Sequence, residues 1–220
     1  MRTQRPDICR ELTLVSQGYK LIAGIDEAGR GAWAGPVVAA TCILPLECAG
    51  LQQDLCLVRD SKLLSPRQRD ACYECITAIA TCWGVGMVSA VEIDRIGILP
   101  ATRLAMVQAV NALAQPPSLL MIDAVHLPQL TISQIVEPKS DLHYLSVASA
   151  SIIAKVTRDR LLVSLDAEYA GYGFARHKGY GTAQHRAALA ELGICEEHRR
   201  SYRPIFEILN AKQRESEKQN

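Results

Sequence analysis

Residues 21–31 have the sequence Leu-Ile-Ala-Gly-Ile-Asp-Glu-Ala-Gly-Arg-Gly, and this stretch decides how the chain folds. It begins as an apolar run of the kind that forms a buried strand, which we expect over residues 20–26. Two adjacent carboxylates, Asp26 and Glu27, end the run. Neighbouring strand residues point to opposite faces of a sheet, so the two acids share a site only where the strand ends or bends. Gly29 and Gly31 permit such a bend, because glycine tolerates a positive φ and a close approach of its backbone to a ligand.

Two further acids extend this pattern into a candidate metal site. Asp123 closes a second short apolar run, and Asp141 precedes a long helix that we expect over residues 146–168. If the strands before Asp26 and Asp123 are neighbours, their ends lie about 5 Å apart, which lets two carboxylates bridge one ion. Carboxylates without a histidine or cysteine cluster select Mg²⁺ or Mn²⁺ over zinc, and two such ions suit in-line phosphoryl displacement. Taken singly, each acid has a simpler interpretation as a turn residue, a strand-end cap or a residue on the approach to a helix.

Length and composition bound the class of protein. The 220 residues suffice for one domain with a small C-terminal addition, and 49% hydrophobic residues are ordinary for a globular core. The net charge of +1 means that a nucleic-acid binder must concentrate its basic residues locally. We expect no membrane span and no export signal, and therefore a reduced, cytoplasmic protein, which we also expect to be a monomer. The eight cysteines show no disulfide spacing, and Cys72 with Cys75 fits the buried face of a helix better than a zinc site.

Strands and helices alternate along the chain, which predicts an α/β fold with a mixed sheet. The apolar runs predict strands at 20–26, 37–44, 82–88, 119–122 and 130–136, the first two antiparallel. Helical spacing and breakers predict helices at 66–80, between Ser89 and Gly97, at 100–114, 146–168 and 182–192, and a short one after Pro204.

The helix starts and the domain limits follow from local signals. Ser65 with Gln68, and Ser89 with Glu92, each predict a capping box at the start of a helix. We expect one domain over residues 20–206, whose C-terminal helical part begins near residue 170. Residues 1–19 and 207–220 are expected to be flexible ends.

Four blocks of the chain resemble, in the family's order, the motifs of bacterial ribonuclease HII, a type 2 ribonuclease H. These blocks are Gly24–Gly31 with Gly35–Ala40, Asp60–Ser65, Ser149–Asp159, and Tyr172–Thr182 with His185. The resemblance implies the ribonuclease-H-like fold, a mixed β-sheet flanked by helices with a C-terminal helical extension. It implies a metal-dependent endonuclease, using Mn²⁺ or Mg²⁺, that cuts the RNA strand of RNA/DNA hybrids. It further implies incision at single ribonucleotides in duplex DNA, leaving 5′-phosphate and 3′-hydroxyl ends.

The resemblance also assigns roles to individual residues. The four catalytic, metal-binding acids of the family match Asp26, Glu27, Asp123 and Asp141. Gly29, Arg30 and Gly31 match the loop whose backbone reads the 2′-hydroxyl, the group that distinguishes RNA from DNA. Tyr180 matches the tyrosine at the junction between the ribonucleotide and the following deoxyribose, although packing under the C-terminal helices would explain it too. The chain departs from the family's Lys-Gly-Asp at Ser140, directly before Asp141.

Basic residues gather near the C-terminal block. Between residues 171 and 203, six lysines or arginines and three histidines stand against three acids: Arg176, Lys178, Arg186, Arg199, Arg200 and Arg203, with His177, His185 and His198, against Glu191, Glu196 and Glu197. Such a stretch suits tracking of phosphates, and an ordinary solvated face is the alternative. We expect Lys178 and Lys62 to contact substrate, although Lys62 could instead pair with Asp60.

Two other classes of function stay open on the sequence. One is a nucleic-acid-binding module without turnover, which would not require clustered carboxylates, because these repel phosphates when no metal is bound. The other is a two-metal phosphatase or exonuclease with different substrates. That class shares the acids but has no need of the loop at residues 29–31.

Overall fold

The computed structural model describes residues 5–219, and the side chains of residues 5–211. The expected flexibility of residues 1–4 and 220 lies outside this range. The chain divides into two compact units. Unit 1 comprises the chain up to Ala28, Val38–Met87 and Thr102–Thr157, and unit 2 comprises Gly29–Val37, Val88–Ala101 and the chain from Arg158 onward. A single domain over residues 20–206 stays a prediction.

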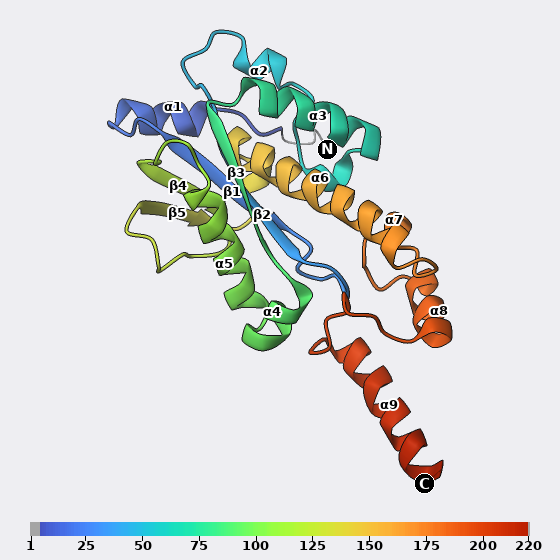
Figure 1. The fold of residues 1–220 in the computed structure, drawn as a ribbon. Coiled ribbons are helices and arrows are strands. Elements are labelled where there is room, and N and C mark those ends of the chain that lie inside the picture. The colour runs from blue at the N-terminus through green and yellow to red at the C-terminus, as the bar shows by residue number, and fades with distance from the viewer. Residues whose placement is uncertain (1–4, 220) are drawn as a thin grey trace. The chain divides into compact units, whose positions relative to one another are not determined.

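A five-stranded mixed sheet with the order β3-β2-β1-β4-β5 forms the centre of unit 1 (Figure 1). Its strands are β1 (Ile22–Ala28), β2 (Val37–Ile43), β3 (Cys82–Val88), β4 (Leu119–Asp123) and β5 (Ser133–Glu137). β1 pairs antiparallel with β2 and parallel with β4, and β4 pairs parallel with β5. The predicted α/β class, the mixed sheet and the antiparallel first pair are thus confirmed.

β5 begins three residues later than the sequence predicts. The side chain of Gln134 forms hydrogen bonds with backbone groups of the preceding residues, which holds them in a loop. Its Oε1 accepts a hydrogen bond from the Leu127 N–H at 2.9 Å, and its Nε2 donates to the Leu127 carbonyl at 2.7 Å. The same nitrogen lies 3.4 Å from the Leu130 carbonyl, which it also reaches as a donor. Residues 127–130 therefore form a loop held by one amide side chain.

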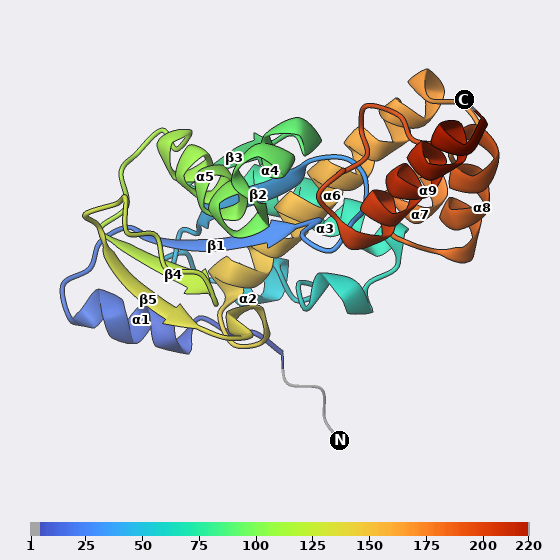
Figure 2. The same cartoon turned by 90° about the horizontal axis from the view of Figure 1, so that it is seen from below.

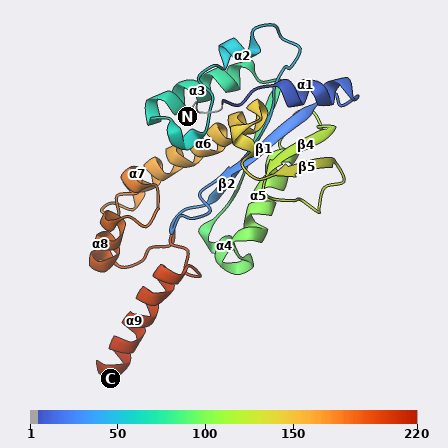
Figure 3. The same ribbon diagram turned by 180° about the vertical axis from the view of Figure 1, so that it is seen from behind.

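Helices cover both faces of this sheet (Figures 1 and 3). On one face, α3 (Pro66–Ile79) and the first part of α6 (Leu145–Glu168) join the strands in one apolar cluster that includes Ala40, Cys42, Cys72, Ile76 and Ala148. On the other face, α5 (Ile98–Asn111) meets β3 at two glycines. A Cβ added at Gly86 would lie 2.1 Å from the Ala105 carbonyl oxygen, so only glycine lets the helix backbone approach this closely.

Helix α1 (Cys9–Ser16) lies within the lead-in that was expected to be flexible (Figure 2). Leu14 packs with Ile22 and Val147 in an apolar cluster. Glu11 is fully buried, and its Oε1 accepts hydrogen bonds from the N–H and Oγ of Ser146 at 3.2 and 3.1 Å. Burial raises the pKa of Glu11 to about 6. This segment is therefore fixed to the start of α6, and with only two buried residues on eight it leaves too little periodicity to predict.

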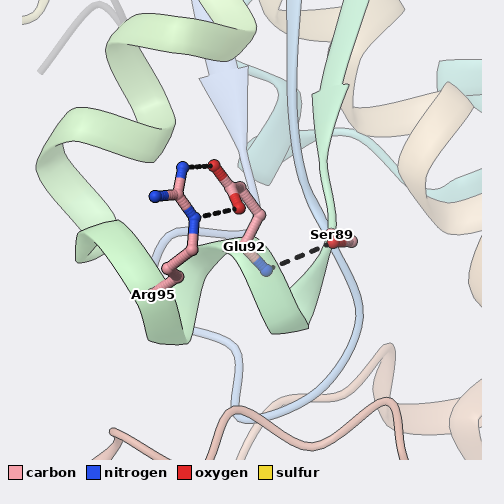
Figure 4. A network of polar contacts seen from close by, with 3 residues as sticks. All are labelled: Ser89, Glu92 and Arg95. Atoms are coloured by element: carbon pink, nitrogen blue, oxygen red, sulfur yellow. Dashed lines mark hydrogen bonds and ion pairs between the residues drawn. The ribbon is translucent and has the colours of Figure 1, made fainter.

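The two predicted capping boxes differ in outcome. At Ser65 the box is complete, because its Oγ accepts from the Gln68 N–H and Gln68 Oε1 accepts from the Ser65 N–H at 2.9 Å. At α4 (Ala90–Ile96), Ser89 Oγ accepts from the Glu92 N–H at 3.3 Å, but the Glu92 carboxylate binds the Arg95 guanidinium at 2.7 and 2.5 Å (Figure 4). The charged donor replaces the neutral backbone N–H, because charge-assisted hydrogen bonds are the stronger ones.

Unit 2 contains α4, the second part of α6, α7 (Phe174–His177), α8 (Ala183–Leu192) and α9 (Arg203–Gln219). The predicted helical C-terminal part is confirmed. α7 is one turn inside a stretch expected to be a loop, and α9 continues to Gln219, where the sequence favours a flexible end. A second apolar cluster, which includes Phe174, Tyr172 and Leu189, forms the core of this unit.

Two remaining expectations concern the cysteines and the membrane. All eight cysteines are free, and Cys72 is buried on α3 with Cys75 half-buried beside it, as the sequence predicts. Short elements complete the chain: α2 (Leu51–Asp54) and the 3₁₀ turns Ser61–Leu63 and Ser140–Leu142. Among the described residues, the helices are all too short or too polar to cross a membrane.

Candidate active site

The carboxyl ends of β1 and β4 carry the two acids on which the candidate site depends. The register of this parallel pair runs up to the residues directly before Asp26 and Asp123, so the acids follow at adjacent strand ends. Asp26 is buried, and its Oδ1 accepts from the Glu27 N–H at 2.7 Å. Asp123 Oδ1 accepts from the Ser140 N–H at 3.1 Å. The two strands are therefore neighbours, which is the condition that the sequence left open for a shared site.

The carboxyl group of Asp26 has a strongly raised pKa. Burial raises the pKa of this carboxyl well above its usual range, and the charges of Glu27 and Asp123 raise it further. A hydrogen bond with Ser151 and the Glu27 N–H act in the opposite direction. Carboxylates gathered away from water without a counter-charge cost free energy, and a cation among them would remove that cost.

Asp141 lies in the 3₁₀ turn before α6 and is also buried. Burial raises its pKa, and the charges of Asp123 and Asp60 add to the rise, whereas Lys62 lowers it. Asp141 is therefore within electrostatic reach of Asp123 and Asp60, and the exposed Lys62 lies near it. Ser140, where the chain departs from the family motif, is buried and donates to the Glu137 carbonyl at 2.6 Å and to Asp123 through its N–H.

Polar residues that the sequence analysis did not assign to the site support these acids. Ser151 on α6 bonds Asp26, and its Oγ lies 3.2 Å from the Oγ of Ser61. Asp60 accepts from the Lys62 N–H at 2.9 Å and thereby starts the 3₁₀ turn that holds Ser61. These residues lie in two of the sequence blocks quoted above, so membership in a block was the available signal. No charge or spacing pattern singled out the two serines.

The donor set fits a hard divalent cation in its chemistry. The four acids present only carboxylate oxygens, which Mg²⁺ and Mn²⁺ prefer. As placed, no three histidine, cysteine, aspartate or glutamate side chains among the described residues close around a point where a metal ion could sit. Asp123 is nevertheless close enough to both Asp26 and Asp141 for its charge to add to the rise that burial causes in the pKa of each. Holding a cation would therefore require changes of side-chain torsions within this group.

The residues predicted to bind substrate on the Gly-rich loop and near α7 lie in unit 2. Gly29 has a φ of +93°, and a Cβ added there would lie 2.0 Å from Nε of Arg158, whereas a Cβ at Gly31 would meet open space. The exposed Tyr180 ring lies 5.5 Å from the guanidinium carbon of Arg158. Lys178 donates through Nζ to the Ala175 carbonyl, which gives this ammonium a structural role within its own loop. Its contact with substrate stays a prediction, as does that of Arg30.

Three buried histidines lie in the basic stretch, and they do not track phosphates. His185 Nε2 lies 3.0 Å from His198 Nε2, and the rings of His185 and His177 stack with centroids 4.3 Å apart. Arg199 from the same stretch is also fully buried, so for these residues neither the phosphate-tracking interpretation nor the alternative of a solvated face holds. A count of basic residues in the sequence gives their number, but which of them are exposed depends on how unit 2 folds.

We expect unit 2 to lose stability in acid because its histidines are buried. Burial lowers the pKa of His185 to about 4, with a contribution from the His177 charge, and burial with the His185 charge lowers that of His198 to about 4. From the ordinary value near 6.5 down to about 4, the unfolded chain binds protons that the folded chain does not. Stability should therefore fall as the pH falls through this window. Trp33 lies in unit 2 with its ring 5.7 Å from that of His185, so a Trp83→Phe variant lets Trp33 fluorescence report urea unfolding at pH 7 and pH 5. Equal midpoints at the two pH values would contradict the expectation.

Comparisons with known proteins agree with the motifs and the fold. The family model described as Ribonuclease HII matches residues 23–208. A ribonuclease HII of Roseiflexus castenholzii is 49% identical over 211 residues, covering 96% of this chain and 94% of that protein. One of Chloroflexus aurantiacus is 50% identical over 204 residues, covering 93% and 96%. The fold matches the crystal structure of ribonuclease H2 from Pyrococcus horikoshii with a TM-score of 0.75 and 29% identity, covering 86% of this chain and 97% of that one. The motifs, the mixed sheet and these relatives agree, and the chain belongs to the ribonuclease HII family.

Proposed function

We propose that this protein incises duplex DNA at single embedded ribonucleotides and leaves 5′-phosphate and 3′-hydroxyl ends. As a member of its family it is a ribonuclease H endonuclease that cleaves the RNA of RNA/DNA hybrids. The observation that carries the proposal is Asp26 beside Asp123 at adjacent strand ends, with a pKa raised by burial and further by the charges of Glu27 and Asp123. A protein that only binds nucleic acid gains nothing from such a group, because it repels phosphates when no cation is present.

We assign Asp26, Glu27, Asp123 and Asp141 to hold Mn²⁺ or Mg²⁺. Cations held there would supply activation of the attacking water and stabilisation of the leaving 3′-oxygen. The hydrogen bonds from Ser151 and from the Glu27 N–H hold the Asp26 carboxylate in one orientation. Orienting a ligand in this way raises the precision of a site, because ligand orientation is set by the groups behind it.

In unit 2 we assign the backbone of Gly29, Arg30 and Gly31 to the ribose 2′-hydroxyl, and Tyr180 to the adjoining sugar. A 2′-hydroxyl both donates and accepts hydrogen bonds, so backbone groups can recognise it without a charged side chain. Open space at Gly31 and the exposure of Tyr180 are consistent with these roles. For Lys62 we propose a contact with phosphate near Asp141.

The test of the function uses three end-labelled substrates with either Mn²⁺ or Mg²⁺. They are a DNA duplex with one ribonucleotide, the same duplex in all-DNA form, and an RNA/DNA hybrid. We expect cleavage of the first and the third, with a 3′ end that a polymerase extends and a 5′ end that a ligase joins. Cleavage of the hybrid alone would refute the single-ribonucleotide activity. Equal cleavage of all-DNA duplex would instead favour a general two-metal nuclease.

Tyr180→Ala should slow incision at single ribonucleotides by roughly tenfold or more, because base or sugar stacking on an aromatic ring contributes about 1–3 kcal/mol. The Tyr180 ring is 36% exposed, so its truncation should lower the melting temperature less than truncation of a fully buried aromatic residue would. Tyr180→Phe is the matched control and should lose less, since the ring performs most of the positioning. A large loss of stability in Tyr180→Ala with normal cutting by the folded protein would show that the residue only packs.

A further inference from the structure

Two arginines of unit 2, Arg158 and Arg199, are fully buried and bind backbone carbonyls. Arg158 donates through Nε to Pro36 at 2.9 Å, through Nη2 to Ala34 at 2.9 Å and through Nη1 to Lys178 at 2.8 Å. Its guanidinium thus joins the segment that follows Gly31 to the loop that carries Tyr180.

Arg199 binds the same segment from a second position. It donates through Nε to the Gly35 carbonyl at 2.9 Å, and through Nη1 to the Arg30 carbonyl at 3.0 Å and the Tyr202 hydroxyl at 2.9 Å. The Tyr202 hydroxyl in turn donates to the Arg30 carbonyl. Together, the two guanidinium groups bind four carbonyls between residues 30 and 36.

Burial of two guanidinium groups is expensive. Burial lowers the pKa of Arg158 to about 10 and also lowers the pKa of Arg199, which shows that the charged forms lose hydration in the fold. Nη2 of Arg199 is buried without a hydrogen-bond partner among the described residues. An unsatisfied buried donor costs free energy, and apolar side chains of similar volume would fill the space without that cost. What the two arginines provide in return for this cost is a fixed orientation of the carbonyls between residues 30 and 36.

The contact with Arg30 has a directional consequence. A trans peptide unit is planar, so its C=O and N–H point in opposite directions. The carbonyl of Arg30 faces Arg199 and Tyr202, and the N–H of Gly31 in the same peptide unit therefore points away from them. Nothing lies within 4 Å of a Cβ built at Gly31, so the space on the Cβ side of this residue is open.

We propose that Arg199 and Tyr202 are positioning residues for ribonucleotide recognition. They fix the peptide between Arg30 and Gly31 so that the Gly31 N–H is presented to the ribose 2′-hydroxyl. Arg158 holds the following residues 34–36 and completes the support. This inference rests on the proposed function, because it explains how the 29–31 loop would read the 2′-hydroxyl.

A merely structural role makes a different prediction. If the arginine and the tyrosine only stabilise unit 2, their conservative variants should lower stability and leave the choice between ribonucleotide and deoxyribonucleotide unchanged. If they orient the Gly31 N–H, the choice should weaken in protein that is still folded.

The test compares Tyr202→Phe with Tyr172→Phe. Both variants remove one hydroxyl that donates to a backbone carbonyl in unit 2, but Tyr172 donates to Gly193 at 3.1 Å, outside the 29–36 segment. Fluorescence anisotropy in EDTA, where no cleavage occurs, gives the affinity for a single-ribonucleotide duplex and for its all-DNA counterpart. The ratio of the two affinities is the readout, with the melting temperature as the control for folding.

We expect Tyr202→Phe to reduce this ratio by about threefold to tenfold, the value of one hydrogen bond, with affinity for all-DNA duplex unchanged. Arg199→Lys should reduce it further, and Tyr172→Phe should retain the wild-type ratio. A wild-type ratio in Tyr202→Phe would overturn the inference even if Arg199→Lys fails to fold. Absence of any ribonucleotide preference in the wild-type protein would overturn it too. Only the cleavage assay on the three substrates decides the proposed incision activity, so the two failures are distinguishable.

Discussion

Asp26→Asn should reduce cleavage by roughly a thousandfold or more, the size of effect seen when one preorganised charge-stabilising group is removed from an active site. Asparagine keeps an oxygen at the position that accepts the Glu27 N–H. It removes the negative charge that a shared metal ligand must supply. Initial rates on an RNA/DNA hybrid in Mn²⁺ and in Mg²⁺ measure the effect, and Asp54→Asn on the exposed part of α2 is the matched control.

The same variant should not lose stability in the absence of metal. An acid whose pKa is higher in the folded than in the unfolded state makes folding less favourable at every pH above its unfolded pKa. The pKa of Asp26 is raised in this way, so at pH 7 its charge costs stability that asparagine restores. Thermal unfolding in EDTA should show an equal or higher midpoint. A lower midpoint with activity retained would identify Asp26 as a strand-end cap, and a folded variant that cuts at the wild-type rate would place the site elsewhere.

Gly24→Ala should cause a large loss of stability in unit 1. A Cβ at this position on β1 would lie 2.2 Å from the carbonyl carbon of Ser146 and 2.3 Å from the nitrogen of Val147. These are backbone atoms in the first turn of α6, so no side-chain rotation relieves the clash. Overpacking of this kind costs about 3 kcal/mol or more, which corresponds to a melting temperature lower by roughly 10 °C.

Gly31→Ala is the control for that measurement, because nothing lies within 4 Å of a Cβ built there. Its melting temperature should match that of the wild-type protein. If Gly24→Ala melts like Gly31→Ala, then α6 does not pack on β1 as closely as the structure shows.

Much of the fold follows from local sequence signals. The apolar runs before Asp26 and Asp123 predict β1 and β4, whereas their pairing was a condition that only the structure could settle. The capping box at Ser65 involves residues three apart, so the sequence contains all the information about it. Features that depend on such near neighbours are the ones that could be predicted.

Features that depend on residues far away in the sequence could not be predicted. Helix α1 is fixed by the contact of Glu11 with Ser146, which is 135 residues away. The capping box at Ser89 is a local exception: Glu92 binds Arg95 instead of completing the box, and sequence alone does not decide between these two near partners. In the sequence, Arg199 is indistinguishable from the other basic residues of its stretch. In the structure it is buried and binds carbonyls that lie 164 and 169 residues away in the sequence. The site behaves likewise: its acids were predicted, whereas Ser151 and Ser61 were not.

The contact of Arg158 with the α-carbon of Gly29 makes these two positions epistatic. A methyl group at residue 29 would occupy the space of the Arg158 Nε, which three backbone carbonyls hold in place together with the rest of the guanidinium. Gly29 is thus constrained from the interior of the protein as well as by its own φ of +93°. In a double-mutant cycle, Gly29→Ala should cost less in an Arg158→Ala background than in the wild type. A random library that varies the loop alone would therefore record glycine at residue 29 as a demand of the substrate, although part of that demand comes from a side chain 129 positions later in the sequence.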